Sequence, residues 1–484
     1  MQIVFAASEC APWARSGGLG EVIRALPRQI ARLGHNVSAY IPYYRQVREQ
    51  LPEKKYAVRS ITIPFQYYSR FASVLDGGVH DGVQMYFVDC PELFDREFLY
   101  GTPAGAYQDN WERFALFSRA VLEAAKLLGA PDLFHVHDWQ TALLPVYLRT
   151  LYYFDPVLRN RGTVLTIHNA GYQGLYPANT VERLLLPGDV FTMERAEYFG
   201  QFNYLKGGIV YADRLTTVSP RYAEEIQTRE YGQGLDGVLR QRATELTGIL
   251  NGLDYGQWNP ATDGNIAAHY TPESLSNKAE CRRDLIHAFG AGPIDDATAV
   301  LGVVTRLTTQ KGIDVLAEIA EPLMRENVVL VALGSGEEYY ENLLRSLAAK
   351  HSGRILVRIG YDDMLAHKVE AGSDMFLMPS RYEPCGLGQL VALKYGTVPV
   401  VRATGGLDST VEEWNAETRA GTGFKFSGLG GEDFLAAIER ALSVFADRAA
   451  WQTLMRNGMA EDHSWAGPAA KYIEVYEQVA RAKN

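Results

Sequence analysis

The sequence predicts an α/β protein with mostly parallel sheets, divided into two domains of similar build. Short apolar runs alternate with helical patterns from one end of the chain to the other. The length of 484 residues exceeds what one hydrophobic core usually organises. A stretch rich in turn residues at 250–260 is followed by polar sequence to about residue 275, which is typical of a linker.

Apolar runs define the expected strands, and amphipathic patterns define the helices between them. In the first half, strands are predicted at 2–7, 36–41, 84–88, 133–137, 163–168 and 214–218, with helices at 21–33 and 111–128 among others. In the second half, strands are predicted at 299–305, 328–333, 355–359, 374–378 and 398–401. A last helix, 468–482, could pack on either domain. We assign 1–265 to the first domain, 266–465 to the second and 466–484 to a terminal helical segment.

Composition excludes several classes of function. The net charge of -10, with no offsetting basic tract, argues against a nucleic-acid partner. No apolar stretch approaches the roughly 20 residues of a membrane helix, and a strand begins at residue 2, so we expect neither a membrane partner nor a signal peptide. The four cysteines are scattered without a CxxC pair, which fits a reducing compartment, and we expect a cytoplasmic protein: Cys10, Cys90, Cys281 and Cys385.

Two segments of the second domain, 304–312 and 379–388, carry the most informative chemistry. Each follows an apolar run and leads into a helical pattern, so each is expected at the carboxyl end of a strand, where ligands bind. Arg306 and Lys311 are suited together to neutralising a diphosphate, although a lone cation is often simply solvated. Glu383 is either a hydrogen-bonding partner for a sugar or a carboxylate favoured by the following helix. No Asp/His cluster has metal-ligand spacing, and no metal is expected.

A glycine loop at 15–21 follows the first predicted strand and opens a helix. Its glycines allow the backbone to approach a phosphate, and the alternative is a tight turn with a capping serine. The spacing is not GxGxxG, and no acid follows the second strand, so we exclude an NAD site. A similar sequence, Thr404-Gly405-Gly406-Leu407, opens a helix in the second domain, and two such loops would suit a ligand held between the domains.

Polar residues also end two strands of the first domain. His135 and His137 share one strand face and are interpreted as structural, while Asp138 and Trp139 at the strand end are candidates for sugar contact. His168 ends the strand 163–168 at the carboxyl edge, where function is expected, although a satisfied core histidine is the alternative.

In their order along nearly the whole chain, these motifs resemble those of bacterial glycogen synthases and plant starch synthases, which are two-domain glycosyltransferases with a GT-B fold. The resemblance rests on the segments already described and on 135–139, 166–169 with 172–174, 212–219, and 251–254 with 258–260. It implies two Rossmann-like domains with a deep cleft between them and a terminal helix that packs back on the N-terminal domain. The implied reaction is the transfer of glucose from ADP-glucose to the 4-hydroxyl at the non-reducing end of an α-1,4-glucan, with retention. The implied partners are ADP-glucose or ADP and a glucan or maltooligosaccharide acceptor, with no cofactor.

The resemblance also implies residue roles. Arg306 and Lys311 would hold the diphosphate, Glu383 would contact the donor glucose, and His168 would lie near the reacting carbon. Tyr361 would stack on the base, and Gly386 and Leu387 would present amides to phosphate. Donor or acceptor glucose would be positioned by Asp138, Trp139 and Asn251. The remaining expected binding residues are Arg15, Gly17, Gly18, Glu21, Cys385 and Thr404.

The chain departs from the family pattern at three places. Arg15 stands where the family usually has Lys, Glu21 where it has Asp, and Ser409 where it has Asp, with Asp408 one place earlier. Arginine keeps the charge of lysine but not its reach or geometry. The open alternatives are UDP-glucose as donor and a glucan-binding paralogue with weakened catalysis. A glucan phosphorylase is a third, but no segment suggests a pyridoxal phosphate site.

Overall fold

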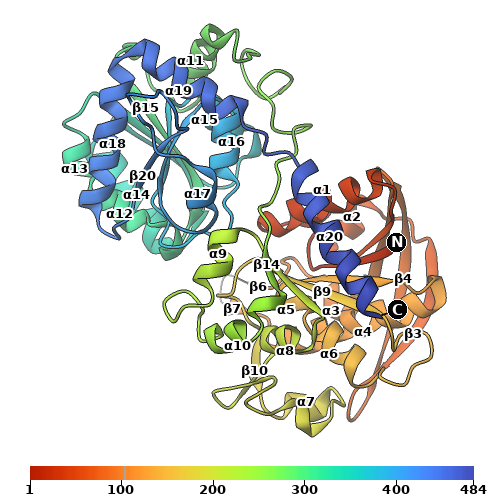
Figure 1. The fold of residues 1–484 in the computed structure, drawn as a ribbon. Coiled ribbons are helices and arrows are strands. Elements are labelled where there is room, and N and C mark those ends of the chain that lie inside the picture. Colours follow the sequence, from red (N-terminus) through yellow and green to blue (C-terminus); the bar gives the residue numbers. More distant parts are fainter. Residues whose placement is uncertain (103–104, 484) are drawn as a thin grey trace. The chain divides into compact units, whose positions relative to one another are not determined.

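The computed structural model describes residues 1–102 and 105–483. The chain divides into two compact units (Figure 1). Unit 1 comprises Met1–Gly252 together with Trp465–Asn484, and unit 2 comprises Leu253–Ser464. The chain therefore passes from one unit to the other at 252/253 and at 464/465. The boundaries assigned from the sequence were 265/266 and 465/466.

Unit 1 is built on a nine-stranded sheet with the order β14-β13-β9-β8-β1-β2-β5-β4-β3. The strands from β14 to β5 pair in parallel, whereas β3, β4 and β5 pair antiparallel. Six strands confirm the runs predicted in this half: β1 (Gln2–Ala6), β2 (Asn36–Pro42), β5 (Val83–Asp89), β8 (Leu133–His137), β9 (Gly162–Ile167) and β13 (Arg214–Thr217).

Three strands of this sheet were not predicted: β3 (Tyr56–Pro64), β4 (Ser69–His80) and β14 (Leu246–Gly248). β3 forms an edge, and its residues are mostly exposed or half-buried, so the strand lacks a continuous apolar run. β14 has only three residues, which is too short for a pattern. Smaller pairings are β6 (Gly101–Thr102) with β7 (Gly105–Ala106), and β10 (Leu175–Pro177), β11 (Glu197–Tyr198) and β12 (Gln201–Asn203).

The main helices of unit 1 are α1 (Gly18–Arg32), α4 (Asn110–Leu128) and α20 (Ala466–Lys483). Shorter helices complete the unit: α2 (Arg45–Gln50), α3 (Pro91–Phe94), α5 (Asp138–Thr141), α6 (Leu143–Arg149), α7 (Thr180–Arg183), α8 (Tyr204–Tyr211), α9 (Pro220–Glu225) and α10 (Asp236–Gln241). The terminal helix α20, dark blue in Figure 1, packs against β8, β9 and α1. The packing is close, because a Cβ at Gly162 would lie 2.2 Å from the side chain of Val479.

Unit 2 contains a six-stranded parallel sheet with the order β17-β16-β15-β18-β19-β20. Five strands confirm the predicted runs: β15 (Ala299–Leu307), β16 (Val328–Gly336), β17 (Ile355–Ile359), β18 (Met375–Met378) and β19 (Val398–Arg402). The sixth, β20 (Phe424–Phe426), was not predicted and has three residues. The helices are α11 (Lys278–Ala288), α12 (Ile313–Glu318), α13 (Ala320–Leu323), α14 (Glu338–Lys350), α15 (Asp363–Gly372), α16 (Gly388–Lys394), α17 (Gly405–Thr410), α18 (Gly431–Ala446) and α19 (Arg448–Ala460).

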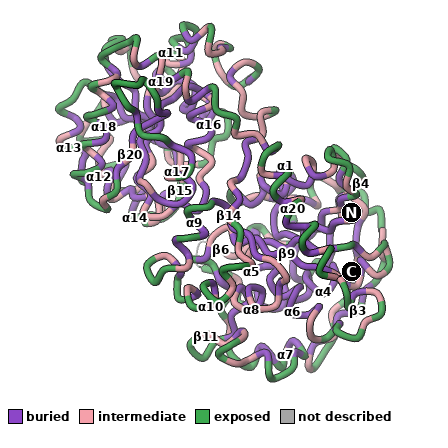
Figure 2. Tube along the Cα trace, viewed as in Figure 1, coloured by how far each residue is buried: buried purple, intermediate pink, exposed green. Residues whose placement is uncertain are grey.

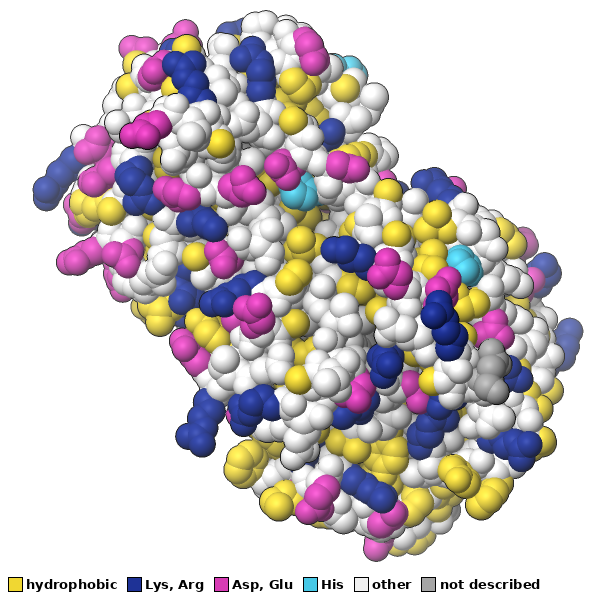
Figure 3. All heavy atoms as spheres, viewed as in Figure 1, with side chains coloured by type: hydrophobic (Ala, Val, Ile, Leu, Met, Phe, Trp, Pro, Cys, Tyr) yellow, Lys and Arg dark blue, Asp and Glu magenta, His cyan; other side chains and the backbone are white. Residues whose placement is uncertain are grey.

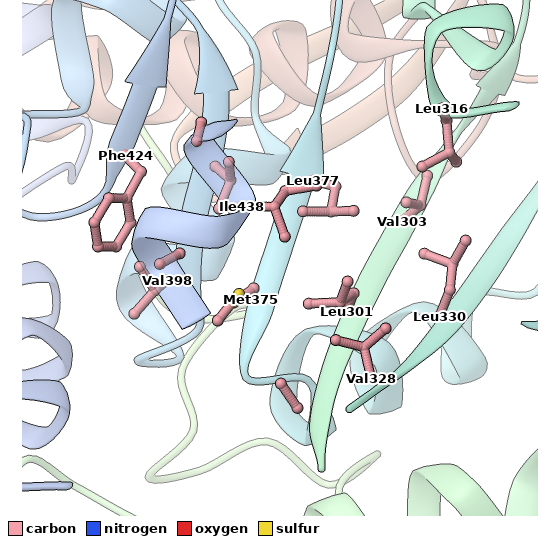
Figure 4. Close-up of a cluster of buried hydrophobic side chains, with 14 of the residues drawn as sticks. Leu301, Val303, Leu316, Val328, Leu330, Met375, Leu377, Val398, Phe424 and Ile438 are labelled. Atoms are coloured by element: carbon pink, nitrogen blue, oxygen red, sulfur yellow. The ribbon is translucent and has the colours of Figure 1, made fainter. Parts of the chain in front are cut away.

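The central strands of unit 2 are buried on both faces, which explains their continuous apolar runs. On one face, Leu301 and Leu377 meet side chains from covering helices, including Leu316 of α12 and Ile438 of α18 (Figure 4). Figure 2 shows the same pattern in each unit, with buried strands inside and exposed loops outside. On the face drawn in Figure 3, Lys and Arg side chains are interspersed with Asp and Glu side chains. Within the described ranges, no helix is long and apolar enough to cross a membrane.

Candidate functional site

In unit 1, the candidate residues gather at the carboxyl ends of three neighbouring strands, β9, β8 and β1. His168 follows β9, Asp138 follows β8, and the glycine loop lies between β1 and α1. Parallel strands end at one edge of a sheet, so these three segments come together without any special local sequence signal.

Asp138 holds the turn from β8 into α5. Its φ of 56° lies in the left-handed region, which is uncommon for a residue with a side chain and concentrates at functional sites. Its Oδ1 accepts the backbone N–H of His168 at 2.7 Å, which ties the ends of β8 and β9 together. Burial raises the pKa of Asp138 to about 7, although backbone N–H groups of His168 and Asn169 act in the opposite direction.

Three imidazoles lie in contact behind this edge. Nδ1 of His137 lies 3.0 Å from Nε2 of His168, and the rings of His135 and His137 have centroids 4.1 Å apart. Burial lowers the pKa of His168 to about 3, and burial also holds the pKa values of His135 and His137 well below the ordinary range. All three rings are therefore neutral. In residues 1–102 and 105–483, no group of three or more His, Cys, Asp or Glu side chains is arranged to hold a metal ion.

The first glycine loop is occupied by a carboxylate of the protein itself. Glu9, which is 4% exposed, accepts the backbone N–H of Ser16 at 2.7 Å and that of Gly17 at 3.2 Å. It also accepts the Ser16 hydroxyl at 2.7 Å and the Tyr100 hydroxyl at 2.6 Å. The alternative of a capping serine is wrong, because Gly17 is the N-cap of α1 and the Ser16 hydroxyl is bound to Glu9. A phosphate that used these amides would have to displace Glu9.

Arg15 and Glu21, the two residues of this loop that depart from the family pattern, form an ion pair. Arg15 donates to Glu21 at 2.5 Å, and both side chains are partly exposed. Sequence reasoning missed Glu9, although a carboxylate three residues beyond an apolar strand lies at the edge where function is expected.

Trp139 and Asn251 are more buried than the other candidates of unit 1. Trp139 is 9% exposed, with its ring edge-on to Phe114 and against Gly174, where a Cβ would lie 2.5 Å away. Most of its surface is thus used in packing. Asn251 is 7% exposed, and its amide oxygen has no hydrogen-bond partner among the described residues. A buried amide oxygen without a donor suits a ligand hydroxyl.

In unit 2, the charged candidates lie at the ends of β15 and β18, which are neighbours in the sheet. Lys311, in a 3-10 turn after β15, forms an ion pair with Oε2 of Glu383. Ser380 donates to the same oxygen at 3.0 Å. Arg306, within the end of β15 rather than in the turn, is exposed and forms no ion pair with any described residue.

The second glycine loop supports the segment that carries Glu383. A Cβ at Gly405 would lie 1.9 Å from the carbonyl oxygen of Glu383, and one at Gly406 would lie 1.8 Å from that of Cys385. The Gly406 N–H donates to the Glu383 carbonyl at 3.0 Å. Only glycine permits so close a backbone approach. Thr404 is the fully buried N-cap residue of α17.

The remaining candidates of unit 2 surround this segment. Cys385 is buried, and Gly386 has a left-handed φ of 72°, with the Gln389 side chain in the space a Cβ would need. Leu387 is half-buried at the N-cap of α16. Tyr361, after β17, is 73% exposed, and its hydroxyl donates to Asp363 at 2.9 Å.

Ser409 and Asp408, which depart from the family pattern, both have partners in this part of unit 2. The Ser409 hydroxyl donates to the Gly405 carbonyl at 3.2 Å, and Asp408 pairs with Lys425 at 3.0 Å.

Comparisons with known proteins agree with this architecture. Residues 2–241 match the family described as starch synthase catalytic domain, and residues 288–453 match the family described as glycosyl transferases group 1. A glycogen synthase of Koribacter versatilis is 55% identical, covering 100% of this chain and 99% of the relative. A glycogen synthase of Syntrophotalea carbinolica is 44% identical, covering 99% of each chain.

Solved structures show the same fold. The catalytic domain of starch synthase IV from Arabidopsis thaliana, bound to ADP and acarbose, superposes with a TM-score of 0.89 at 31% identity, covering 99% of each chain. A sucrose-phosphate synthase from Thermosynechococcus elongatus has a TM-score of 0.62 at 16% identity over the full length of both chains, a likeness of fold alone. The expected two-domain GT-B class is confirmed by these likenesses.

Proposed function

Since the chain belongs to the glycogen synthase and starch synthase family of glycosyltransferases, we propose that it transfers glucose from ADP-glucose to α-1,4-glucan. The acceptor is the 4-hydroxyl at the non-reducing end of a glucan or maltooligosaccharide, and the anomeric configuration is retained. The relatives at 55% and 44% identity over the full chain support a glycogen synthase activity. ADP in the starch synthase IV structure supports an adenine nucleotide as the donor's leaving group.

The observation that carries the proposal is the contact between Lys311 and Glu383 at the ends of β15 and β18. The two side chains are 15% and 7% exposed, so their charges act in a poorly solvated place. Lys311 and the exposed Arg306 supply positive charge for a diphosphate, and Glu383 supplies an acceptor for glucose hydroxyls. Ser380 holds Oε2 of Glu383, which leaves Oε1 for the sugar.

In the same proposal, unit 1 supplies neutral hydrogen-bonding groups for the sugar. His168 lies at the carboxyl edge of β9 as an uncharged imidazole, and Asn251 offers its unpaired amide oxygen. Such groups distinguish sugar hydroxyls without attracting the diphosphate. In the proposal, Asp138, Trp139 and Asn251 position glucose, while Arg15, Glu21 and the loop amides of Gly17 and Gly18 adjust donor binding.

The chemistry we propose is a front-face displacement. The acceptor 4-hydroxyl attacks the anomeric carbon on the side from which ADP leaves, so a C–O bond forms as the C–O bond to the diphosphate breaks. The acceptor proton passes to the departing phosphate oxygen, and the products are ADP and a glucan one glucose longer. Arg306 and Lys311 stabilise the charge that develops on the diphosphate. Double displacement would need a second carboxylate about 5 Å from its partner, and we assign no such partner to Glu383.

We propose that the reaction needs no cofactor or metal, that neither a nucleic acid nor a membrane is a partner, and that the enzyme acts in the cytoplasm. The four buried cysteines suit a reducing compartment.

One assay tests the donor. ADP-glucose and UDP-glucose are supplied separately with a maltooligosaccharide, and nucleotide release and chain growth are measured. Growth with ADP-glucose and an α-linked product is expected. Growth with UDP-glucose alone would overturn the donor assignment, and growth with neither would favour a glucan-binding protein with weakened catalysis.

A substitution tests the role of Lys311. Lys311→Ala should lower kcat about 100- to 1,000-fold, as expected when one electrostatic contact to a developing charge is lost, with little change in glucan affinity. Lys350→Ala in the same unit removes an exposed lysine paired with Glu321 and should leave turnover unchanged. Equal turnover of Lys311→Ala and the native protein would refute the assigned role.

A further inference from the structure

A line of side-chain contacts runs through unit 1 from the terminal helix α20 to His168. The Tyr476 hydroxyl lies 2.7 Å from Nδ1 of His135. The His135 ring lies against the ring of His137, whose Nδ1 lies 3.0 Å from Nε2 of His168. From this arrangement we propose that His137 is a positioning residue that holds His168 as the tautomer protonated on Nδ1.

Two arrangements of protons are compatible with the short contact. Both rings are neutral, so one proton lies between the facing nitrogens. Either His137 donates from Nδ1 to Nε2 of His168, or His168 donates from Nε2 to Nδ1 of His137. In the second arrangement, His137 must carry its own proton on Nε2.

The surroundings of His137 decide between them. Its Nε2 is buried and has no hydrogen-bond partner in the described part of the chain. The ring is fully buried, with Phe5 stacked nearly parallel at 5.8 Å. A buried N–H with no acceptor is rarer in proteins than an under-satisfied acceptor. The first arrangement avoids that orphaned N–H, so His137 is the donor.

The donor role of His137 determines which nitrogen of His168 carries the proton. Its Nε2 accepts from His137, and its backbone N–H is bound to Asp138. Its Nδ1 therefore carries the proton, and this nitrogen has no partner within residues 1–102 and 105–483. His168 presents one neutral N–H donor at the carboxyl edge of β9.

This donor deepens the proposed function and rests on it for the identity of the ligand. A fixed N–H suits an oxygen of the donor glucose, and the ring has no free lone pair with which to remove a proton. His168 then cannot serve as a general base, which agrees with proton transfer to the departing phosphate. The His137 ring acts only through His168.

The tautomer is measured directly by NMR on the full-length protein with ¹⁵N-labelled histidine, using His168→Gln to assign the signals of His168. The expected spectrum has a protonated Nδ1 and an unprotonated Nε2 in His168. A proton on Nε2 of His168 overturns the proposal. The measurement needs no activity, so failure of glucosyl transfer would refute the proposed function and leave this result standing.

Variants test what the contact does. His137→Phe removes the donor and keeps a flat ring; it should allow the other tautomer and lower kcat about tenfold, with little change in KM for maltooligosaccharide. His137→Asn keeps an amide N–H near the position of Nδ1 and should restore most of the turnover. Unchanged kcat and tautomer in His137→Phe would overturn the proposal. If that variant does not fold, the native spectrum and His137→Asn still decide.

The matched control is Thr216→Val. It removes a buried hydrogen bond of 2.6 Å to Thr166, which itself contacts His135, without touching His168. We expect the tautomer and kcat of this variant to be those of the native protein. A loss of kcat as large as that of His137→Phe would overturn the specific role of His137.

Discussion

The two glycine loops have nearly the same sequence and different structural roles. In unit 1, the amides of Ser16 and Gly17 bind the buried carboxylate of Glu9, and a Cβ at Gly17 would meet no atom within 4 Å. In unit 2, Gly405 and Gly406 press against the backbone of Glu383 and Cys385. The first loop has open space at Gly17 and is anchored by a side chain, whereas the second is closely packed and supports a charged segment.

The two loops also differ in the charged and neutral groups that surround them. The edge of unit 1 contains neutral imidazoles and a carboxyl whose pKa is about 7, together with the Glu9 carboxylate and the ion pair of Arg15 and Glu21 in the glycine loop. The edge of unit 2 is built from the ion pair of Lys311 and Glu383 with the exposed Arg306 nearby. In the function proposed above, unit 1 would contact the uncharged sugar and unit 2 would hold the charged diphosphate.

Among the variants that test the comparison of the two loops, the largest effect is expected at the second loop. A methyl group at Gly406 would lie 1.8 Å from the Cys385 carbonyl oxygen, so Gly406→Ala must displace the segment that carries Glu383. We expect kcat to fall about 100-fold, since small displacements of positioning groups have effects of this size. Gly292→Ala, where no atom lies within 4 Å, is the control in the same unit. Native activity in Gly406→Ala would mean that the second loop is not a support.

The neutral histidines of unit 1 and the buried acids of unit 2 predict opposite responses to acid. The buried histidines of unit 1 have folded pKa values below the unfolded value of about 6.5, so their stabilisation is lost as pH falls from there toward 3. Asp138 acts in the opposite direction, because its raised pKa means that the folded state binds one proton more readily than the unfolded state. In unit 2, the raised pKa values of Glu370 and Asp374 favour the fold on acidification, whereas the lowered pKa of His463 opposes it with one proton.

Between pH 7 and 5, the opening of β8 and β9 should therefore increase about tenfold or more per pH unit, while β15 and β16 should open no more readily. Hydrogen exchange followed by mass spectrometry, corrected for the intrinsic rate, measures both units in one sample. Equal acceleration in both sheets would contradict the assignment of neutral histidines to unit 1.

A smaller effect is expected at the ion pair of the first loop. Arg15→Lys replaces a planar group held at 2.5 Å from Glu21 by a mobile ammonium. We expect KM for ADP-glucose to change about threefold to tenfold, with kcat changed less. Glu21→Asp and the double variant complete a double-mutant cycle, and strict additivity would show that the pair does not act as a unit.

The smallest effect is expected for Gly17→Ala. Gly17 has an extended φ of -165°, and the added methyl group meets nothing. Thermal stability should be unchanged, and KM for ADP-glucose should change about twofold at most, because alanine keeps the backbone N–H that donates to Glu9. A large loss of donor affinity would show that the loop opens and receives the ligand at this position.

Sequence patterns determined a large part of this structure. The buried parallel strands were predicted because they are apolar on both faces, while the half-exposed edge strand β3 and the three-residue β14 and β20 carry too little pattern. The positions of Lys311, Glu383 and His168 at carboxyl ends of strands were predicted from apolar runs that are followed by turn residues and a helical pattern. The family and its two-domain fold followed from the order of the motifs.

Only the tertiary structure decided which groups touch. Glu9 is bound to the loop amides, and Ser380 holds Glu383. His137 meets His168 because neighbouring strands bring residues distant in sequence to one edge. Likewise, Tyr476 reaches His135 across 341 positions because α20 packs on β8 and β9. The physical reason is that periodicity records which face of an element is buried, whereas hydrogen bonding and tautomer depend on the three-dimensional neighbours that burial brings together.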